Sequence, residues 1–150
     1  MPLLLGRTTY RSHNRSRDWA AAYYLPEVLV ALALVRLGLT FIGLSGVRAL
    51  GLPALLRQPV AQLDPGRLAR AVRAGSRLVP FASCLTQAQA VQILLARRGM
   101  ASTISLGVRE TAAGELAAHA WLSAGGRLLI GGNTHELAVF RHLAELGPTR

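Results

Sequence analysis

The sequence predicts an α+β fold, on two observations. In the first half of the 150-residue chain, apolar residues recur at helical spacing. The second half begins with one more stretch of helical spacing and continues with segments in which apolar and polar residues alternate. Alternation of this kind is typical of half-buried strands, and a glycine pair separates two of the segments as the turn of a hairpin would. Helices followed by a run of strands, without regular helix–strand alternation, indicate an α+β fold.

The composition excludes several classes of protein. Hydrophobic residues make up 51% of the chain, enough to bury a core, so an intrinsically disordered protein is excluded. A single cysteine excludes intramolecular disulfides and the secreted, disulfide-bonded class. All 17 basic residues are arginine, against 7 acids, for a net charge of +10. A nucleic-acid binder would cluster its charge, whereas these arginines are spread from Arg7 to Arg150; the densest run, Arg7 to Arg17 with Tyr10 beside it, is typical of a solvated arm, so we expect no nucleic-acid partner.

Residues 1–24 are polar, basic and aromatic without an apolar period, and they predict a flexible arm. They lack the order and the cleavage site of a secretory signal, so we expect a cytoplasmic protein. The most apolar window, Val28 to Val47, is long enough to span a bilayer, but Arg36 lies in its middle. A helix buried in the protein or against a partner is therefore favoured over one that spans or lies on a membrane.

Residues 25–80 as a whole predict a helical N-terminal region. Pro53 to Leu63 predicts a short helix or loop. Asp64 and Pro65 suit the N-cap and the first position of a following helix, and apolar residues recur after them at helical spacing.

Residues 81–150 predict the core that carries the chemistry. Ser83 to Arg98 has the apolar spacing of a helix, with Gly99 behind it as a terminator. The elements expected after it are strands at 102–109, 116–124 and 127–131, and a final helix from His135 to Leu146 capped by Asn133-Thr134.

The single thiol and one histidine are the candidate catalytic pair. With Ser83 as N-cap, Cys84 opens its helix, where unpaired N–H groups stabilise a thiolate and can bind an oxyanion. His119 lies on the middle strand, and alternation puts it on the same face as Trp121 and Ser123. An imidazole beside a thiol acts first as base and then as acid in cysteine proteases. An inert buried cysteine and a core histidine are the alternatives.

The strings CLTQAQAVQILLARRGM, ISLGVR, HAWL and LLIGG, in this order, resemble the transglutaminase-like leader peptidases of lasso peptide biosynthesis, which are small papain-like cysteine proteases. The resemblance covers Phe81 to Leu143. It implies a core in which a cysteine-bearing helix packs on a small antiparallel sheet, with Cys84 as nucleophile, His119 as base and no cofactor. It also implies a precursor peptide as substrate, a separate small leader-binding protein, and a downstream ATP-dependent lasso cyclase.

The third catalytic residue is where the chain departs from the family pattern. The pattern has an aspartate about a dozen residues after the histidine, where this chain has Gly131 and Gly132. Asn133 is the preferred substitute, since papain-type sites accept asparagine as the orienting residue. Glu136, or a backbone carbonyl or another residue, is the alternative. A two-residue hairpin turn would point Asn133 away from His119, and a three-residue loop or a bulge near the two glycines would correct the register.

Two other functions fit the same residues. An amide acyltransferase would use the same thiol with an amine as acceptor, and an inactive module would serve as a scaffold in a biosynthetic complex. Metal catalysis has no support, because the remaining histidines have no cysteine or carboxylate at ligand spacing.

Overall fold

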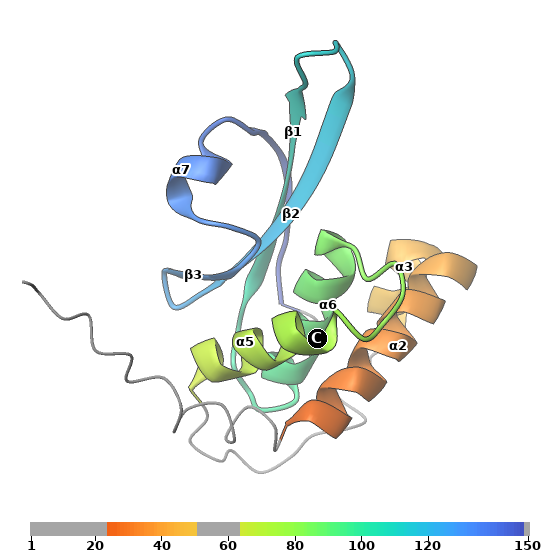
Figure 1. The fold of residues 1–150 in the computed structure, drawn as a ribbon. Coiled ribbons are helices and arrows are strands. Elements are labelled where there is room, and N and C mark those ends of the chain that lie inside the picture. The colour runs from red at the N-terminus through yellow and green to blue at the C-terminus, as the bar shows by residue number, and fades with distance from the viewer. Residues whose placement is uncertain (1–23, 51–63, 149–150) are drawn as a thin grey trace, which may run out of the picture.

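A four-stranded antiparallel sheet and a layer of helices make up the part of the chain that the structure describes, residues 24–50 and 64–148 of the computed structural model (Figure 1). The strands lie in the order β3-β2-β1-β4. The predicted α+β class is therefore confirmed. The predicted arm, apart from Tyr24, and the stretch from Pro53 to Leu63 lie outside the described residues. The elements are α2 (Leu25–Phe41), α3 (Gly43–Ala49), α5 (Pro65–Gly75), α6 (Cys84–Ala96), β1 (Thr103–Glu110), β2 (Leu116–Ala124), β3 (Arg127–Ile130), α7 (Thr134–Leu137) and β4 (Arg141–Leu146).

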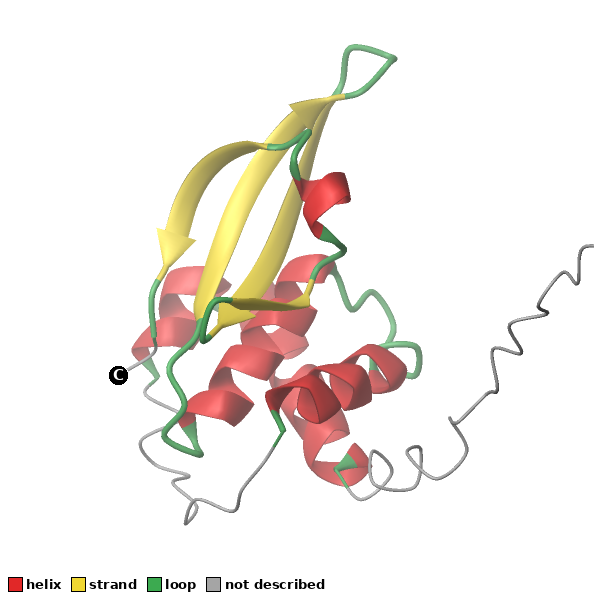
Figure 2. Ribbon diagram, turned by 90° about the vertical axis from the view of Figure 1, so that its left-hand side faces the viewer, coloured by secondary structure: helices red, strands yellow, loops and turns green. Residues whose placement is uncertain are grey.

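One hydrophobic core joins the helices to the sheet. Helix α6 is its centre, because it contacts α2 and α5 on one side and β1 and β2 on the other. Figure 2 shows the helices other than the short α7 gathered at one end of the sheet, with the β1–β2 hairpin extending beyond them. The residues of the core that are fully buried include Val28 and Leu32 of α2, Leu94 of α6, and Leu122 of β2. The helical N-terminal region thus shares its core with the cysteine helix.

The apolar window from Val28 to Val47 forms two helices. Helix α2 ends at Phe41, and α3 begins at Gly43, whose φ of 70° is a conformation that glycine adopts without strain. Val28, Leu32 and Val35 of α2 are buried in the core. Of the helices in residues 24–50 and 64–148, none has the length and apolar character to cross a membrane.

The predicted final helix from His135 to Leu146 is wrong. The segment contains only the single turn of α7, and β4 then pairs antiparallel with β1, with Ile104 opposite Leu146. The apolar spacing misleads here, because the segment buries little: Leu143 is 56% exposed. Edge pairing supplies main-chain hydrogen bonds along β1, which a weakly buried helix would not gain.

The predicted caps of α5 and α6 and the three predicted strands are confirmed. Asp64 caps α5 by accepting the N–H of Gly66, at 2.9 Å, with Pro65 as first helical residue. Ser83 caps α6 by accepting the N–H of Thr86, at 3.3 Å. The three strands expected at 102–109, 116–124 and 127–131 agree with β1, β2 and β3 to within one residue at each end.

Candidate active site

Cys84 is the first residue of α6 and is partly buried. The first N–H groups of a helix have no acceptors within it. The hydroxyl of Ser83 accepts the backbone N–H of Thr86. Within the described part of the chain, the backbone N–H groups of Cys84 and Leu85 have no acceptor and stay available to a bound group. The thiol therefore stands beside donors that can hold an oxyanion.

His119 lies on β2, on the strand face that alternation predicts. Ala120 and Leu122 are 2% and 0% exposed on the core side, and His119 and Trp121 are half-buried on the other face. The two rings are stacked with centroids 6.4 Å apart, and Phe140 packs against His119 at 5.3 Å. The imidazole is thus held among aromatic rings on one side.

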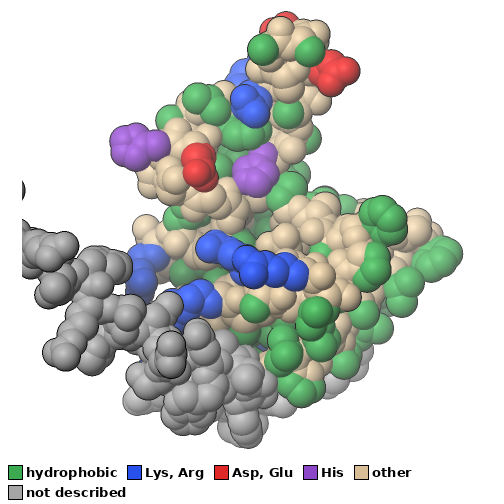
Figure 3. Space-filling view, viewed as in Figure 1, with side chains coloured by type: hydrophobic (Ala, Val, Ile, Leu, Met, Phe, Trp, Pro, Cys, Tyr) green, Lys and Arg blue, Asp and Glu red, His purple; other side chains and the backbone are tan. Residues whose placement is uncertain are grey.

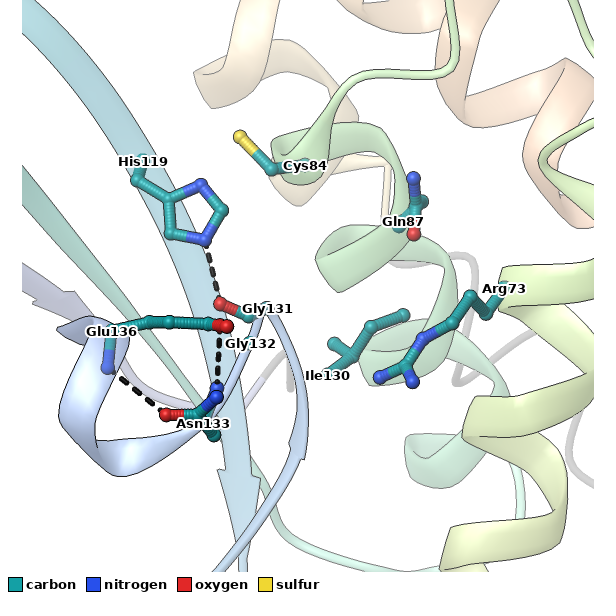
Figure 4. Close-up of a pocket in the computed structure, with 9 residues that line it drawn as sticks. All are labelled: Arg73, Cys84, Gln87, His119, Ile130, Gly131, Gly132, Asn133 and Glu136. Carbon is teal, nitrogen blue, oxygen red and sulfur yellow. Dashed lines mark hydrogen bonds between the residues drawn. The ribbon is translucent and has the colours of Figure 1, made fainter.

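A main-chain carbonyl orients the imidazole. The Nε2 atom of His119 lies 2.6 Å from the oxygen of Gly131. A carbonyl can only accept, so Nε2 carries the hydrogen and donates it, and Nδ1 of the neutral ring keeps its lone pair. Figure 4 shows the sulfur of Cys84 on the side of the ring that carries Nδ1. The free nitrogen is therefore the one that can accept the thiol proton.

The path of β3 brings this carbonyl to the ring. Ser123 pairs with Leu128, but Leu122 pairs with Ile130, so Leu129 is the extra residue of a bulge. The bulge occurs slightly earlier than the glycine pair where sequence reasoning allowed one. Gly131 then adopts a φ of 105°, and a Cβ at this position would lie 2.4 Å from Cβ of Trp121. Only glycine lets the chain pass this close to β2.

Asn133 and Glu136 both line the cleft, but one side-chain oxygen of each is used in the cap of α7. Asn133 Oδ1 accepts the N–H of Glu136, and Glu136 Oε2 accepts the N–H of Asn133, each at 3.0 Å. The hydrogen bond expected from His119 to Asn133 is not formed, and Gly131 takes its place. This is the backbone-carbonyl arrangement that the sequence left open, and a catalytic role for Asn133 stays a prediction.

Cys84 and His119 line one cleft of about 570 Å³. The other walls come from α5, from the end of β3 and from the turn into α7 (Figure 4). Sequence reasoning missed Arg73, which extends from α5 into this space. Its signal was a row of arginines on one helix, but nothing local indicated that this helix borders the site. The complete lining is Arg73, Cys84, Gln87, His119, Ile130, Gly131, Gly132, Asn133 and Glu136.

The chemistry that this arrangement supports is nucleophilic acyl transfer. It has a thiol as nucleophile, an oriented imidazole as base and acid, and helix N–H groups for the oxyanion. Within residues 24–50 and 64–148, no group of three or more His, Cys, Asp or Glu side chains is placed to hold a metal ion.

A family model described as the transglutaminase-like superfamily matches residues 28–145. The match extends beyond the strings from Phe81 to Leu143 and includes most of α2, with all of α3 and α5. Comparison with curated proteins and with solved structures gives no match.

Proposed function

This chain belongs to the transglutaminase-like superfamily, which includes cysteine proteases, and from that premise we propose that it removes the leader peptide from a ribosomally synthesised lasso peptide precursor. One observation carries the proposal: Cys84 and His119 line the same cleft, with the imidazole fixed by the carbonyl of Gly131. The resemblance of the cysteine helix and the HAWL strand to lasso leader peptidases supports the choice of substrate.

The mechanism begins with transfer of the Cys84 proton to Nδ1 of His119. The thiolate attacks the scissile carbonyl carbon, and the N–H groups at the start of α6 bind the oxyanion. His119 then protonates the leaving nitrogen, the C–N bond breaks, and the acyl group remains on sulfur as a thioester. Water, deprotonated by His119, attacks the thioester and releases a carboxylate and the free thiol. Throughout, the carbonyl of Gly131 accepts the Nε2 hydrogen and stabilises the imidazolium.

The size of the cleft supports a role for a separate substrate-binding partner. About 570 Å³ accommodates a drug-sized ligand, which corresponds to only a few residues of a peptide. In the proposed function, a small leader-binding protein presents the precursor to this chain, and an ATP-dependent cyclase takes up the released core peptide.

One observation favours a second candidate. The aspartate of the family pattern is replaced by glycine, as a catalytically inactive scaffold module would tolerate. The rate at which iodoacetamide labels Cys84 separates the two, because an activated thiol reacts fast near neutral pH and an inert one reacts slowly.

The direct test is incubation of the purified chain with a precursor peptide and a leader-binding protein encoded beside it. We expect two fragments whose masses add up to the precursor plus one water. An acyl fragment joined to an added amine instead would make the protein an amide acyltransferase on the same site. An intact precursor together with slow labelling of Cys84 would support the scaffold.

A further inference from the structure

The basic side chain of the cleft, Arg73, has no part in the mechanism above. Arg73 is exposed on α5, which packs against α6 and β3. Figure 4 shows its guanidinium extending from α5 toward Ile130, in the same cleft as Cys84 and His119. A peptide bound for attack by Cys84 would therefore pass within reach of a positive charge.

Arg73 has no ion-pair partner among the described residues, whereas its neighbours on α5 do. Arg67 and Arg70 lie 3.9 and 3.8 Å from the carboxylate of Asp64, at the start of the helix. The acidic side chain that lines the cleft, Glu136, accepts the N–H of Asn133 with Oε2 and makes no ion pair with Arg73. The guanidinium thus enters the cleft with its donors free for a ligand.

The surroundings add to this positive charge. Helix α5 and the residues after it carry Arg67, Arg70, Arg73 and Arg77 at spacings of three and four, so they follow one side of the helix. Figure 3 shows arginine side chains (blue) gathered on the face that α5 presents in this view. A negative charge brought to the cleft is therefore attracted before it binds.

We propose that Arg73 determines specificity by binding the carboxylate of an acidic side chain of the substrate, close to the scissile bond. This inference rests on the proposed peptidase function and names a substrate class for it. A guanidinium matches a carboxylate with two parallel hydrogen bonds, which neither a neutral side chain nor a point charge reproduces. Peptides with Asp or Glu near the cleavage position are the preferred substrates, and their amide analogues are poor ones.

The first experiment needs no peptide substrate. Iodoacetate and iodoacetamide alkylate the single thiol, Cys84, and differ in the carboxylate that only iodoacetate carries. Arg73→Gln should lower the ratio of the iodoacetate rate to the iodoacetamide rate by about two- to fivefold at low salt, the worth of one exposed ion pair. Arg77→Gln is the matched control, since it removes the same charge from a residue that does not line the cleft, and its ratio should fall clearly less than that of Arg73→Gln. An unchanged ratio in Arg73→Gln, or an equal fall in both variants, overturns the proposal.

The second experiment uses internally quenched peptides with amidated C-termini, in which each position is occupied in turn by Glu, Gln or Lys. At one position near the cut, the wild type should prefer Glu by about tenfold in kcat/KM, as expected for a charge-assisted pair. Arg73→Gln should lose this preference, Arg73→Lys should keep part of it, and Arg73→Glu should prefer Lys at that position. Equal cleavage of the Glu and Gln peptides by the wild type, or a preference that persists in Arg73→Gln, overturns the inference and leaves the peptidase standing. If the wild type cleaves neither these peptides nor the precursor presented by its leader-binding protein, while the alkylation ratio depends on Arg73, the carboxylate site stands and the peptidase function fails.

Discussion

Replacing Gly131 with alanine should uncouple the imidazole from the backbone that orients it. The new Cβ would lie 2.4 Å from Cβ and 2.6 Å from Cα of Trp121. Ordinary contact needs at least 3.4 Å, so the end of β3 must move away from β2 by about 1 Å. The hydrogen bond from His119 to the carbonyl, now 2.6 Å, then lengthens to about 3.6 Å, a distance at which it is no longer a hydrogen bond.

The size of the effect follows from the charge that this bond stabilises. A hydrogen bond to a charged group contributes about 1.5–3 kcal/mol, and the imidazole becomes charged when Cys84 gives up its proton. Gly131→Ala should therefore lower kcat by roughly 10- to 150-fold. KM should change little, because the lost interaction is made to the catalytic base and grows as the imidazolium forms.

Gly132→Ala is the matched control. Gly132 also has a positive φ, 114°, so alanine introduces similar backbone strain, but the nearest atoms to its Cβ all belong to the Glu136 side chain, with Oε2 at 2.6 Å, and none to the backbone of β2. Both variants should lose stability in thermal denaturation, Gly131→Ala the more because its Cβ meets the backbone of β2, so activities are compared at a temperature where both are folded. Precursor cleavage and iodoacetamide labelling of Cys84 near neutral pH should be impaired only in Gly131→Ala. A wild-type kcat in Gly131→Ala, or the same loss in both variants, would refute the orienting role of this carbonyl.

Three further results are expected. Asn133→Ala and Glu136→Ala should each cost about 1 kcal/mol of stability in thermal denaturation, because each removes half of the cap of α7. In cleavage assays, both should change kcat less than about tenfold. A far larger kcat loss in Asn133→Ala alone would restore the orienting role predicted from sequence. Glu27→Ala should lower the free energy of unfolding by about 3 kcal/mol in urea titration. It removes the carboxylate that lies 2.6 Å from the guanidinium of Arg98, a side chain only 6% exposed, and leaves that charge buried without its ion-pair partner. A loss under about 1 kcal/mol would contradict this. Deleting residues 1–50 should leave an aggregating or inactive remainder, since it removes the share of the core held by α2, and a fully active fragment would show otherwise.

The parts of the site that the sequence predicted are those with local signals. Ser83, the apolar spacing behind it and Gly99 mark the cysteine helix within one short segment. Strict alternation marks β2 and puts His119 and Trp121 on one face, as their stacked rings confirm. Each of these features is determined by residues that are close together in the sequence, so the sequence alone was enough to predict it.

The parts that escaped prediction depend on contacts between distant segments. The segment Arg141–Leu146 is a strand because the edge of β1 is open to it, and its own apolar spacing favours a helix. The partner of His119 is a main-chain carbonyl, which every residue possesses, and a bulge at Leu129 selects the one from Gly131. Arg73 reaches the cleft because α5 packs beside α6 and β3, an arrangement that the tertiary fold alone determines.

The central claim is that Cys84 and His119 form one catalytic unit, and precursor cleavage by purified alanine variants tests it most directly. Cys84→Ala should keep the circular dichroism spectrum and melting temperature of the wild type, and mass spectrometry should find no fragments above the uncatalysed background. His119→Ala should cleave at least about a thousandfold more slowly than the wild type, because residues that act as a unit each cost most of the rate when removed. Cleavage near the wild-type rate by a folded Cys84→Ala protein would contradict the account.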